Sequence, residues 1–388
     1  MILAISVLLV QGMISAVLLR NRLQFKSIHS QIRSIDPPNN PLVSILIPAR
    51  NEEDVIKNVV ISALKQSYQA IEVIVLDDNS NDNTSSILAQ LALNYGLKLR
   101  VYQGSDRPDG WLGKPWACFQ LSTYASGDIF LFVDADTQLE ETLVDSIIGD
   151  FENNGDGLVT VWPQQILGSF SEKVIIPLVY YTLVSFLFTD YTRRDPKWMP
   201  SHLALMFRNL FAAACGQCIA IPKTIYEHIG GHHLVKSDVV EDVAFARSVR
   251  NMGLPVRMYH GLDSIQCRMY TNHNQIFMGF RKNFLAGFGN NLALFIASAL
   301  LHIMVFILPL ILFPVSVLNN DWMGSILWMI AIVIPIGHRL LLNKWFKWPA
   351  WTAFTHVFGV LWFQYLGLVV LFDRLFNRKV LWKGRTLS

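Results

Sequence analysis

Acidic side chains follow two apolar runs of this chain, at the positions where each run ends. Asp134 and Asp136 come directly after the run 129–133, and the adjacent Asp77 and Asp78 come after the run 72–76. Helix capping is a common role of aspartate, but it does not explain two adjacent aspartates at a strand end. Hard carboxylates with room for phosphate oxygens suit Mg²⁺ or Mn²⁺. The residues therefore predict a divalent-cation site, with Asp134 and Asp136 as the metal ligands.

The elements that must position these acids form an alternating pattern. Strands are expected over 42–47, 72–76, 97–102 and 129–133, and helices over 52–66 and 82–95. This alternation predicts an α/β fold, with a mostly parallel sheet and helices on both faces. Ligands of such sheets bind beyond the carboxyl ends of the strands, which is where the acids lie.

Composition excludes several classes of protein. Of the 388 residues, 52% are hydrophobic and only 16% are charged, whereas soluble domains are about a quarter charged. The mean hydropathy of +0.35 agrees with this shortfall. A disordered chain, a coiled coil and an ordinary cytosolic enzyme are therefore excluded as complete descriptions. A net charge of +3 is too balanced to indicate a nucleic-acid partner, and four cysteines are too few for a disulfide scaffold.

The apolar excess gathers at the two ends of the chain. Residues 1–20 are expected to form an N-terminal transmembrane anchor, and 284–373 a C-terminal transmembrane region of about three apolar segments. Arg20 ends the anchor, and Arg22 and Lys26 follow it, so the next part of the chain is expected on the cytoplasmic side. Between them we expect a linker over 21–41 and a cytoplasmic domain over 42–283, and a basic tail over 374–388 completes the chain. Four spans would put that tail outside, against the positive-inside rule, so the number of C-terminal spans stays open.

Nucleotide-binding loops of the common glycine-rich kinds are missing from the sequence. It has no phosphate-binding loop that ends in Gly-Lys-Ser/Thr, and no Gly-x-Gly-x-x-Gly after the first strand. This argues against a nucleoside triphosphatase and against a dinucleotide oxidoreductase. A nucleotide held by carboxylates and a metal instead indicates a nucleotide-sugar enzyme.

Four motifs in order resemble those of the inverting family 2 glycosyltransferases, which have a GT-A fold. They are Pro48-Ala49-Arg50-Asn51-Glu52, Asp77-Asp78 with Ser80 and Asp82, Asp134-Ala135-Asp136, and Glu241-Asp242. This resemblance covers about 42–283. A narrower one, to membrane glycosyltransferases of carotenoid and hopanoid pathways, rests on the segments 110–114, 267–270 and 382–385.

The resemblance implies a role for each matching residue. Ala49, Glu52 and Asp78 would hold the uridine of the donor, within a donor site that also includes Pro48, Asn51, Asp77, Ser80, Lys114, Asp134 and Arg268. Asp134 and Asp136 would bind the donor diphosphate through Mg²⁺ or Mn²⁺. Asp242, beside Glu241, matches the general base, which removes the proton of an acceptor hydroxyl.

We therefore expect a membrane hexosyltransferase that moves a sugar, with inversion, from a UDP-sugar to a lipid. An isoprenoid, a polyprenyl phosphate and a glycerolipid or sphingolipid all fit as acceptors. Two apolar segments, 174–188 and 277–288, are expected to lie at the bilayer interface and to guide that lipid.

Two other functions stay open at this point. One is a processive polysaccharide synthase, although 266–270 reads Gln-Cys-Arg-Met-Tyr where many processive members carry Gln-x-x-Arg-Trp. The other is a nucleotide-binding membrane transporter or carrier, although the expected spans contain almost no acidic residues.

Overall fold

The computed structural model describes residues 1–31, 33, 40–378, 380–382 and 385–387. It divides into two compact units, each made of several stretches of the chain. The sheet unit comprises 24–166 and 189–269, and the helical unit comprises 1–23, 167–188 and 270–388. Residues 32 and 34–39 of the expected linker, and Lys379, Lys383, Gly384 and Ser388 of the expected tail, lie outside the described residues.

The sheet unit is built on eight strands in the order β3-β2-β1-β4-β7-β6-β8-β5. The strands are β1 Val43–Ala49, β2 Ile71–Asp77, β3 Leu99–Gln103, β4 Ile129–Val133, β5 Thr137–Leu139, β6 Leu158–Gln165, β7 Cys218–Pro222 and β8 Val256–Cys267. Strands β3, β2, β1 and β4 are parallel, as expected, whereas β7 runs antiparallel to both β4 and β6. Strand β8 pairs in parallel with β6, and β5 antiparallel with β8.

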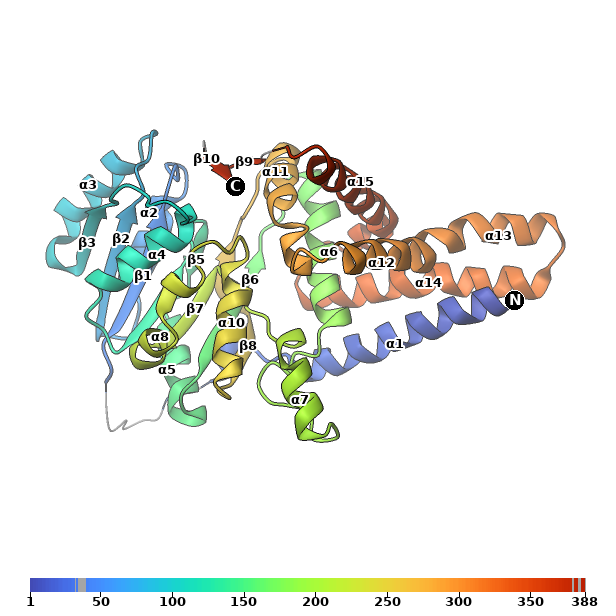
Figure 1. Ribbon diagram of the computed structural model, residues 1–388, viewed down its shortest axis with the longest axis horizontal. Helices are drawn as coiled ribbons and strands as arrows, with labels where there is room; N and C mark the ends of the chain where they lie inside the picture. The colour runs from blue at the N-terminus through green and yellow to red at the C-terminus, as the bar shows by residue number, and fades with distance from the viewer. Residues whose placement is uncertain (32, 34–39, 379, 383–384, 388) are drawn as a thin grey trace. The chain divides into compact units, whose positions relative to one another are not determined.

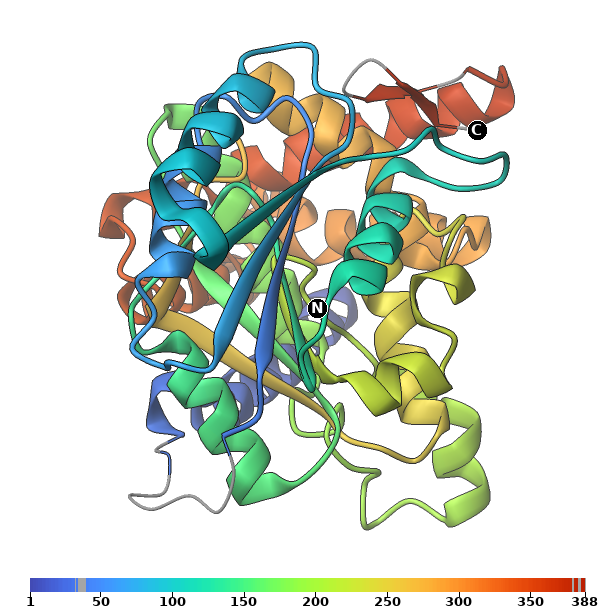
Figure 2. The ribbon, with the colours of Figure 1, turned by 90° about the vertical axis from the view of Figure 1, so that its left-hand side faces the viewer.

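Helices cover both faces of this sheet because alternate side chains of each strand point to opposite faces. Ile45 and Ile47 of β1 pack with α2 Ile56–Leu64, α3 Thr84–Tyr95 and α5 Leu143–Asn154. Leu46, between them, packs on the other face with α4 Gly113–Tyr124, α8 Lys223–His228 and α10 Glu241–Asn251. Figure 2 shows the sheet between these two groups of helices. The expected α/β fold with helices on both faces is therefore confirmed.

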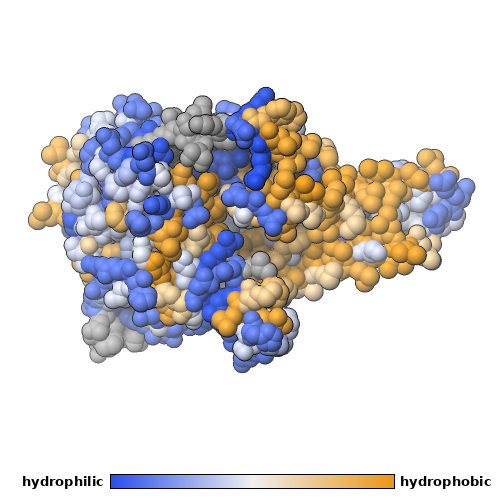
Figure 3. Space-filling view, in the orientation of Figure 1, coloured by the Kyte–Doolittle hydropathy of each residue, from blue (hydrophilic) through white to orange (hydrophobic). Residues whose placement is uncertain are grey.

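The helical unit contains the long apolar helices (Figure 1). Its helices are α1 Ile2–Gln24, α6 Phe170–Phe186, α11 His273–Asn283, α12 Leu292–His302, α13 Leu308–Leu318, α14 Trp322–Trp345 and α15 His356–Leu375, and it ends in the strands β9 Val380–Trp382 and β10 Arg385–Leu387. Four helical segments are long and apolar enough to cross a membrane: Ile2–Gln24, Leu292–Leu318, Trp322–Trp345 and Ala350–Leu375. Apolar surface covers much of this unit in Figure 3. Candidate membrane helices in both end regions of the chain are thus confirmed.

Short elements complete both units. They are α7 Ser201–Phe207 and α9 Gly231–Leu234, the 3₁₀ turns η1 Ile28–Ser30, η2 Gly96–Lys98, η3 Arg208–Leu210, η4 Ala286–Phe288 and η6 Ala350–Thr355, and the π turn η5 Ile303–Ile307.

Helix α6 contains most of the segment that we expected at the bilayer interface. It begins with a capping box, in which the Glu172 N–H donates to the Ser169 side chain and the Glu172 carboxylate accepts the Ser169 N–H. Ten of its seventeen residues are buried. Val174, Ile175 and Ile176 pack with Tyr270 and Ile276 in a small core of the helical unit. The helix thus packs extensively within the protein, and its place at a bilayer interface stays a prediction.

Candidate active site

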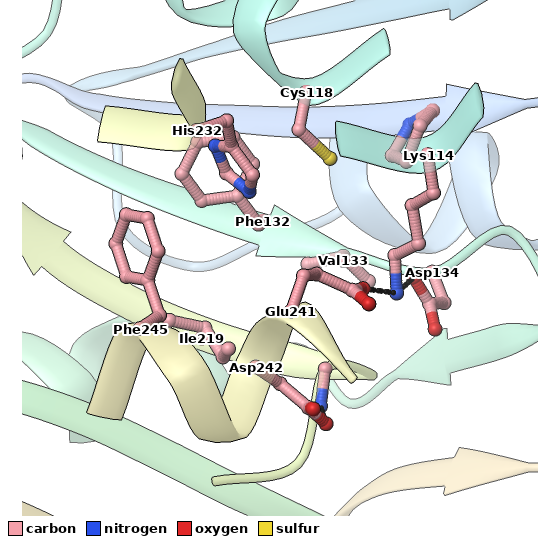
Figure 4. Close-up of a pocket in the computed structure, with 12 residues that line it drawn as sticks. Lys114, Cys118, Phe132, Val133, Asp134, Ile219, His232, Glu241, Asp242 and Phe245 are labelled. Atoms are coloured by element: carbon pink, nitrogen blue, oxygen red, sulfur yellow. Dashed lines mark hydrogen bonds and ion pairs between the residues drawn. The ribbon is translucent and has the colours of Figure 1, made fainter. Parts of the chain in front are cut away.

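A pocket of the sheet unit lies at the carboxyl end of β4, where residues from six parts of the chain meet. It is lined by Pro48, Lys114, Cys118, Phe132, Val133, Asp134, Gly216, Ile219, His232, Glu241, Asp242 and Phe245. The predicted site residues Pro48, Lys114, Asp134, Glu241 and Asp242 therefore share one pocket, although almost 200 residues separate the first from the last. The apolar residues form one wall and the charged residues the other (Figure 4).

Lys114 is the central cation of this pocket. It lies in the first turn of α4, and its Nζ lies 2.7 Å from Asp134 Oδ1 and 3.0 Å from Glu241 Oε1. Burial lowers the pKa of Lys114, but the Asp134 and Glu241 carboxylates outweigh it and raise that pKa well above its ordinary value. The ammonium therefore stays charged and ties the strand end at Asp134 to the start of α10 (Figure 4).

Asp242 lies in the first turn of α10, beside Glu241. Its Oδ2 accepts the Gly216 N–H at 2.8 Å, and its Oδ1 accepts the Val243 N–H at 2.8 Å. Burial, and next the negative charge of Glu241, raise the pKa of Asp242 to about 6. A carboxylate with a pKa near neutrality is a stronger base than an ordinary aspartate, and it is still ionised at pH 7.

Gly216 is a pocket residue that the sequence reasoning missed. A Cβ atom at this position would lie 3.1 Å from Lys114 Nζ and 3.3 Å from Asp242 Oδ2. A side chain would therefore crowd both the cation and the predicted base. The only sequence signal was the Cys215-Gly216-Gln217-Cys218 pattern, which draws attention to its cysteines, yet both thiols are free and buried.

The loops that follow β1 and β2 contain most of the other predicted donor residues, and they bind each other tightly. The Asp78 N–H donates to the Ala49 carbonyl at 2.8 Å, and the Asn51 N–H donates to Ser80 Oγ at 2.9 Å. Glu52 joins the same network, because its N–H donates to Thr84 Oγ1 at 2.8 Å. The predicted residues from 48 to 52 and from 77 to 80 therefore form one rigid wall.

Asp77 and Asp78 have different surroundings within this wall. The Asp77 carboxylate accepts the Ser80 N–H at 3.0 Å and the Ser85 hydroxyl. The side chain of Arg50 donates to the Asp78 carbonyl. Asp77 therefore has a structural task, because it holds the turn that presents Asp78 and Ser80.

Asp136 and Arg268 are joined through their backbones. The Arg268 N–H donates to the Asp136 carbonyl at 3.4 Å, and the Arg268 side chain is exposed. Burial, and next the charges of Asp136 and Asp134, raise the pKa of the Cys267 thiol well above its ordinary value. Strand β8 thus places Arg268 beside the Asp134-Ala135-Asp136 turn, although its side chain does not line the pocket.

The donor set of this turn fits a divalent ion. Asp134 already faces a cation, the Lys114 ammonium, in the pocket. Carboxylate oxygens are the ligands that Mg²⁺ and Mn²⁺ prefer. No group of three His, Cys, Asp or Glu side chains able to hold a metal gathers within the described part of the chain. The ion would therefore need further oxygens from its ligand, as expected for a metal that binds together with a diphosphate.

His232 lines the pocket but is built into the core. Its Nδ1 lies 2.9 Å from Tyr226 Oη, and its ring stacks on Phe245. Burial lowers the pKa of His232 to about 3, so the ring is neutral. It shapes the apolar wall and adds no charge to the pocket.

Comparison with known proteins agrees with this geometry. Residues 44–230 match the model of glycosyl transferase family 2. The match confirms the resemblance inferred from the four motifs, and it spans the strands and loops that build most of the pocket.

Curated relatives narrow the likeness. The chain is 31% identical over 255 residues to a protein of Staphylococcus aureus named 4,4'-diaponeurosporenoate glycosyltransferase, covering 65% of this chain and 63% of the relative. It is 27% identical over 268 residues to a protein of the same name from Staphylococcus haemolyticus, covering 69% and 65%. The chain thus spans slightly less than two thirds of the length of these relatives. The expected similarity to carotenoid-pathway enzymes is confirmed.

A solved structure shares the fold. A mannosyltransferase of Pyrobaculum calidifontis, solved with GDP-mannose and Mn²⁺, superposes with a TM-score of 0.55 at 15% identity, over 97% of this chain and 99% of that one. The GT-A type of fold that we expected is thereby confirmed.

Proposed function

We propose that this protein is a membrane-bound glycosyltransferase that moves a sugar from a UDP-sugar to a lipid acceptor with inversion of the sugar's configuration. The observation that carries the proposal is the pocket, in which a lysine, a metal-binding type of turn and a base with a raised pKa converge. The match of 44–230 to glycosyl transferase family 2 supports the same reaction class.

The donor would bind along the wall formed by the loops after β1 and β2. Ala49, Glu52 and Asp78 would hold the uridine, and the hydrogen bonds between the two loops keep those residues in place before the donor arrives. The fold itself does not select the nucleobase of the donor, because the similar mannosyltransferase was solved with GDP-mannose. The choice of uridine rests on these loop residues.

The diphosphate would lie beside Asp134 and Lys114. A Mg²⁺ or Mn²⁺ ion held by Asp134 and Asp136 would supply positive charge to the departing diphosphate. Lys114 would exchange its contact with Asp134 for one with a phosphate oxygen, since its ammonium remains charged in the pocket. The exposed Arg268 side chain is within the same part of the sheet unit and would extend this positive surface.

Asp242 would accept the proton of an acceptor hydroxyl as the sugar is transferred. The Gly216 N–H holds one of its oxygens, and the raised pKa makes it a competent base at neutral pH. In an inverting displacement the acceptor oxygen, as it loses its proton to Asp242, bonds to the anomeric carbon from the side opposite the leaving diphosphate. Glu241 would keep that pKa high while it holds Lys114.

The acceptor is proposed to be an isoprenoid or another membrane lipid, and the sheet unit is proposed to lie on the cytoplasmic side of a cell membrane crossed several times. Four candidate membrane helices support a membrane location. The similar staphylococcal proteins are named for an acceptor that ends in a carboxylate. A carboxylate arrives ionised and needs no base, whereas a hydroxyl does, so Asp242 favours a hydroxyl acceptor here.

The test is transfer by the purified full chain in lipid nanodiscs. The reconstituted protein is supplied with Mn²⁺ and either labelled UDP-glucose or labelled GDP-mannose. The acceptors offered are a set of isoprenoid alcohols and isoprenoid carboxylic acids. We expect UDP release together with one labelled lipid product. A transporter would release no UDP, and a processive synthase would yield a long polymer, so either result would contradict the proposal.

The variant D242N separates the two acceptor chemistries. With an alcohol acceptor it should lose most of its transfer rate, because the other two carboxylates of the pocket, Asp134 and Glu241, are paired with Lys114. With a carboxylic acid it should keep that rate, because no proton must be removed. Equal rates of wild type and D242N on the preferred alcohol would show that Asp242 is not the base.

A further inference from the structure

Segment 189–211 of the sheet unit, which includes α7, exposes large apolar side chains. Trp198 is 70% exposed, Leu205 60% and Met206 68%. These exposed fractions are high for large apolar side chains, and the three residues lie close together in the sequence, between positions 198 and 206. Figure 3 shows apolar surface next to hydrophilic surface over α7. An exposed apolar cluster with a polar rim is typical of an interaction site.

The exposure does not come from a loose chain, because the segment is anchored at several points. The Trp198 indole N–H donates to Tyr191 Oη at 3.0 Å, and the Tyr191 ring contacts Phe211 edge to face. The Thr192 hydroxyl donates to the Val256 carbonyl of β8 at 2.9 Å. The segment is therefore held in place while its apolar side chains point outward.

The charge around this cluster is positive. The segment has four cations, Arg193, Arg194, Lys197 and Arg208, against the two aspartates Asp190 and Asp195. Arg208 and Arg250 both pair with Asp195, and although burial opposes them they hold the pKa of Asp195 below its usual value. The side chains of Arg193, Arg194 and Lys197 are exposed. The surface beside Trp198 is thus cationic.

We propose that segment 189–211 docks onto the surface of a bilayer that contains anionic lipid. Trp198, Leu205 and Met206 would enter the headgroup region, and Arg193, Arg194 and Lys197 would contact lipid phosphates. Tryptophan and leucine beside lysine and arginine is the combination that lies in a membrane interface. The segment follows α6 directly in the chain. This inference does not depend on the proposed reaction.

The test places an environment-sensitive dye at the cluster. All four native cysteines are buried, so the variant L205C can be labelled selectively with NBD in the full chain. The matched control is L97C, which replaces an exposed leucine of the turn before β3. Both proteins are reconstituted into nanodiscs of phosphatidylcholine alone or with phosphatidylglycerol.

For the label at position 205, we expect emission at shorter wavelength and strong quenching by brominated lipid, most of all with phosphatidylglycerol. The label at position 97 should show neither effect. Replacing Arg194 and Lys197 by glutamate should weaken the docking equilibrium by about fivefold or more for each charge removed. Emission and quenching at position 205 equal to those at position 97 would overturn the proposal.

A second copy of the chain is the main rival occupant of this surface. It would shift the emission in lipid-free amphipol as well, in proportion to protein concentration and without quenching by brominated lipid. That pattern would also overturn the proposal, and it would assign the cluster to self-association.

Discussion

Buried and half-buried charges occur in both units, but their surroundings differ. In the pocket of the sheet unit, Lys114 lies between Asp134 and Glu241, and its side chain keeps 37% of its exposure. In the helical unit, Arg339 is fully buried and donates to the Thr352 carbonyl at 3.1 Å. No carboxylate within the described ranges pairs with it. His338, its neighbour, lies between Ser15 Oγ and Tyr181 Oη, at 2.7 and 3.0 Å.

The comparison teaches what each set of charges is for. In the pocket Lys114 pairs with two carboxylates and its side chain is still partly exposed, so a ligand can exchange with it at little cost to the fold. The polar groups of the helical unit join helices that are far apart in the chain, as Gln11 does when it donates to the Val305 and Ala331 carbonyls. Neutralising a charge should therefore reduce the rate in the first region and the stability in the second.

The largest effect is expected for D242N in the sheet unit. With an alcohol acceptor kcat/KM should fall by about 10²- to 10⁴-fold, the usual contribution of a general base. The melting temperature should change little, because the variant removes the repulsion between Asp242 and Glu241 but loses one of the two hydrogen bonds that Asp242 accepts from backbone N–H groups. Steady-state transfer rates and thermal unfolding check the two expectations.

The matched control for that experiment is D238N, which changes an exposed aspartate three residues before α10. It should retain nearly full transfer rate. If D242N lost its fold together with its activity, the assignment of this charge to function would be wrong.

The opposite result, a loss of stability and not of activity, is expected for D373N in the helical unit. Asp373 accepts two hydrogen bonds from Arg281, at 2.6 and 2.7 Å, and its side chain is buried. Removing the negative charge weakens a two-point contact and should cost about 1.5–3 kcal/mol of stability. Thermal unfolding of the protein in nanodiscs checks this, with donor KM as the second readout.

The control for that variant is R374Q, which changes the neighbouring exposed arginine. It should leave both stability and donor KM unchanged. A rise in donor KM for D373N without a loss of stability would contradict the division of roles between the two regions.

The dependence of the rate on pH sharpens the comparison further. Burial and Glu241 raise the pKa of Asp242 to about 6, and only its ionised form can act as a base. We therefore expect kcat/KM for an alcohol acceptor to fall by about tenfold for each pH unit below 6. Rate measurements from pH 5 to 8 check this, and the fall in kcat/KM below pH 6 should be absent in D242N.

The same group has the opposite effect on stability. The folded-state pKa lies above the ordinary value of 3.8, so the folded protein binds this proton more strongly than the unfolded chain does. As pH falls from 6 toward 4, Asp242 alone therefore makes folding more favourable. If the rate and the stability of the intact protein both fell between pH 6 and pH 4, another titrating group would be responsible.

The sequence allowed the first half of the sheet and the acids at its edge to be predicted. Strands β1 to β4 are apolar runs bounded by polar turns, and parallel strands bring their carboxyl ends to one edge, so Asp77 and Asp134 could be placed together. The second half could not be read in this way. The apolar run 218–221 lies in β7, and its antiparallel pairing with β4 and β6 depends on contacts between residues far apart in sequence.

Side-chain partners were the other limit of prediction. Asp77 has the residue type of a ligand-binding acid, yet it holds a turn through Ser80 and Ser85. Gly216 has no functional group at all, and it enters the site only through its N–H and its lack of a Cβ. Neither property can be recognised from residue type and spacing alone.

The smallest effect is expected for G216A, which probes how closely the pocket charges are packed. The new methyl group would lie 3.1 Å from Lys114 Nζ and 3.3 Å from Asp242 Oδ2. Because the ammonium is the far end of a flexible side chain, it can move by a few tenths of an ångström without disturbing the fold. We expect stability to change by less than about 1 kcal/mol and kcat/KM to fall by roughly fivefold, since Asp242 and Lys114 would lose their best positions.

The control is G337A in α14, where a Cβ atom would meet nothing within 4 Å. It should leave the rate unchanged and the helix equally stable or slightly more so, because alanine favours helices over glycine. A G216A protein that transferred sugar as fast as wild type would mean that Gly216 does not limit the geometry of the pocket. A large loss of stability would mean that the pocket charges also stabilise the fold. The division of roles between the two regions, rate in one and stability in the other, would then be wrong.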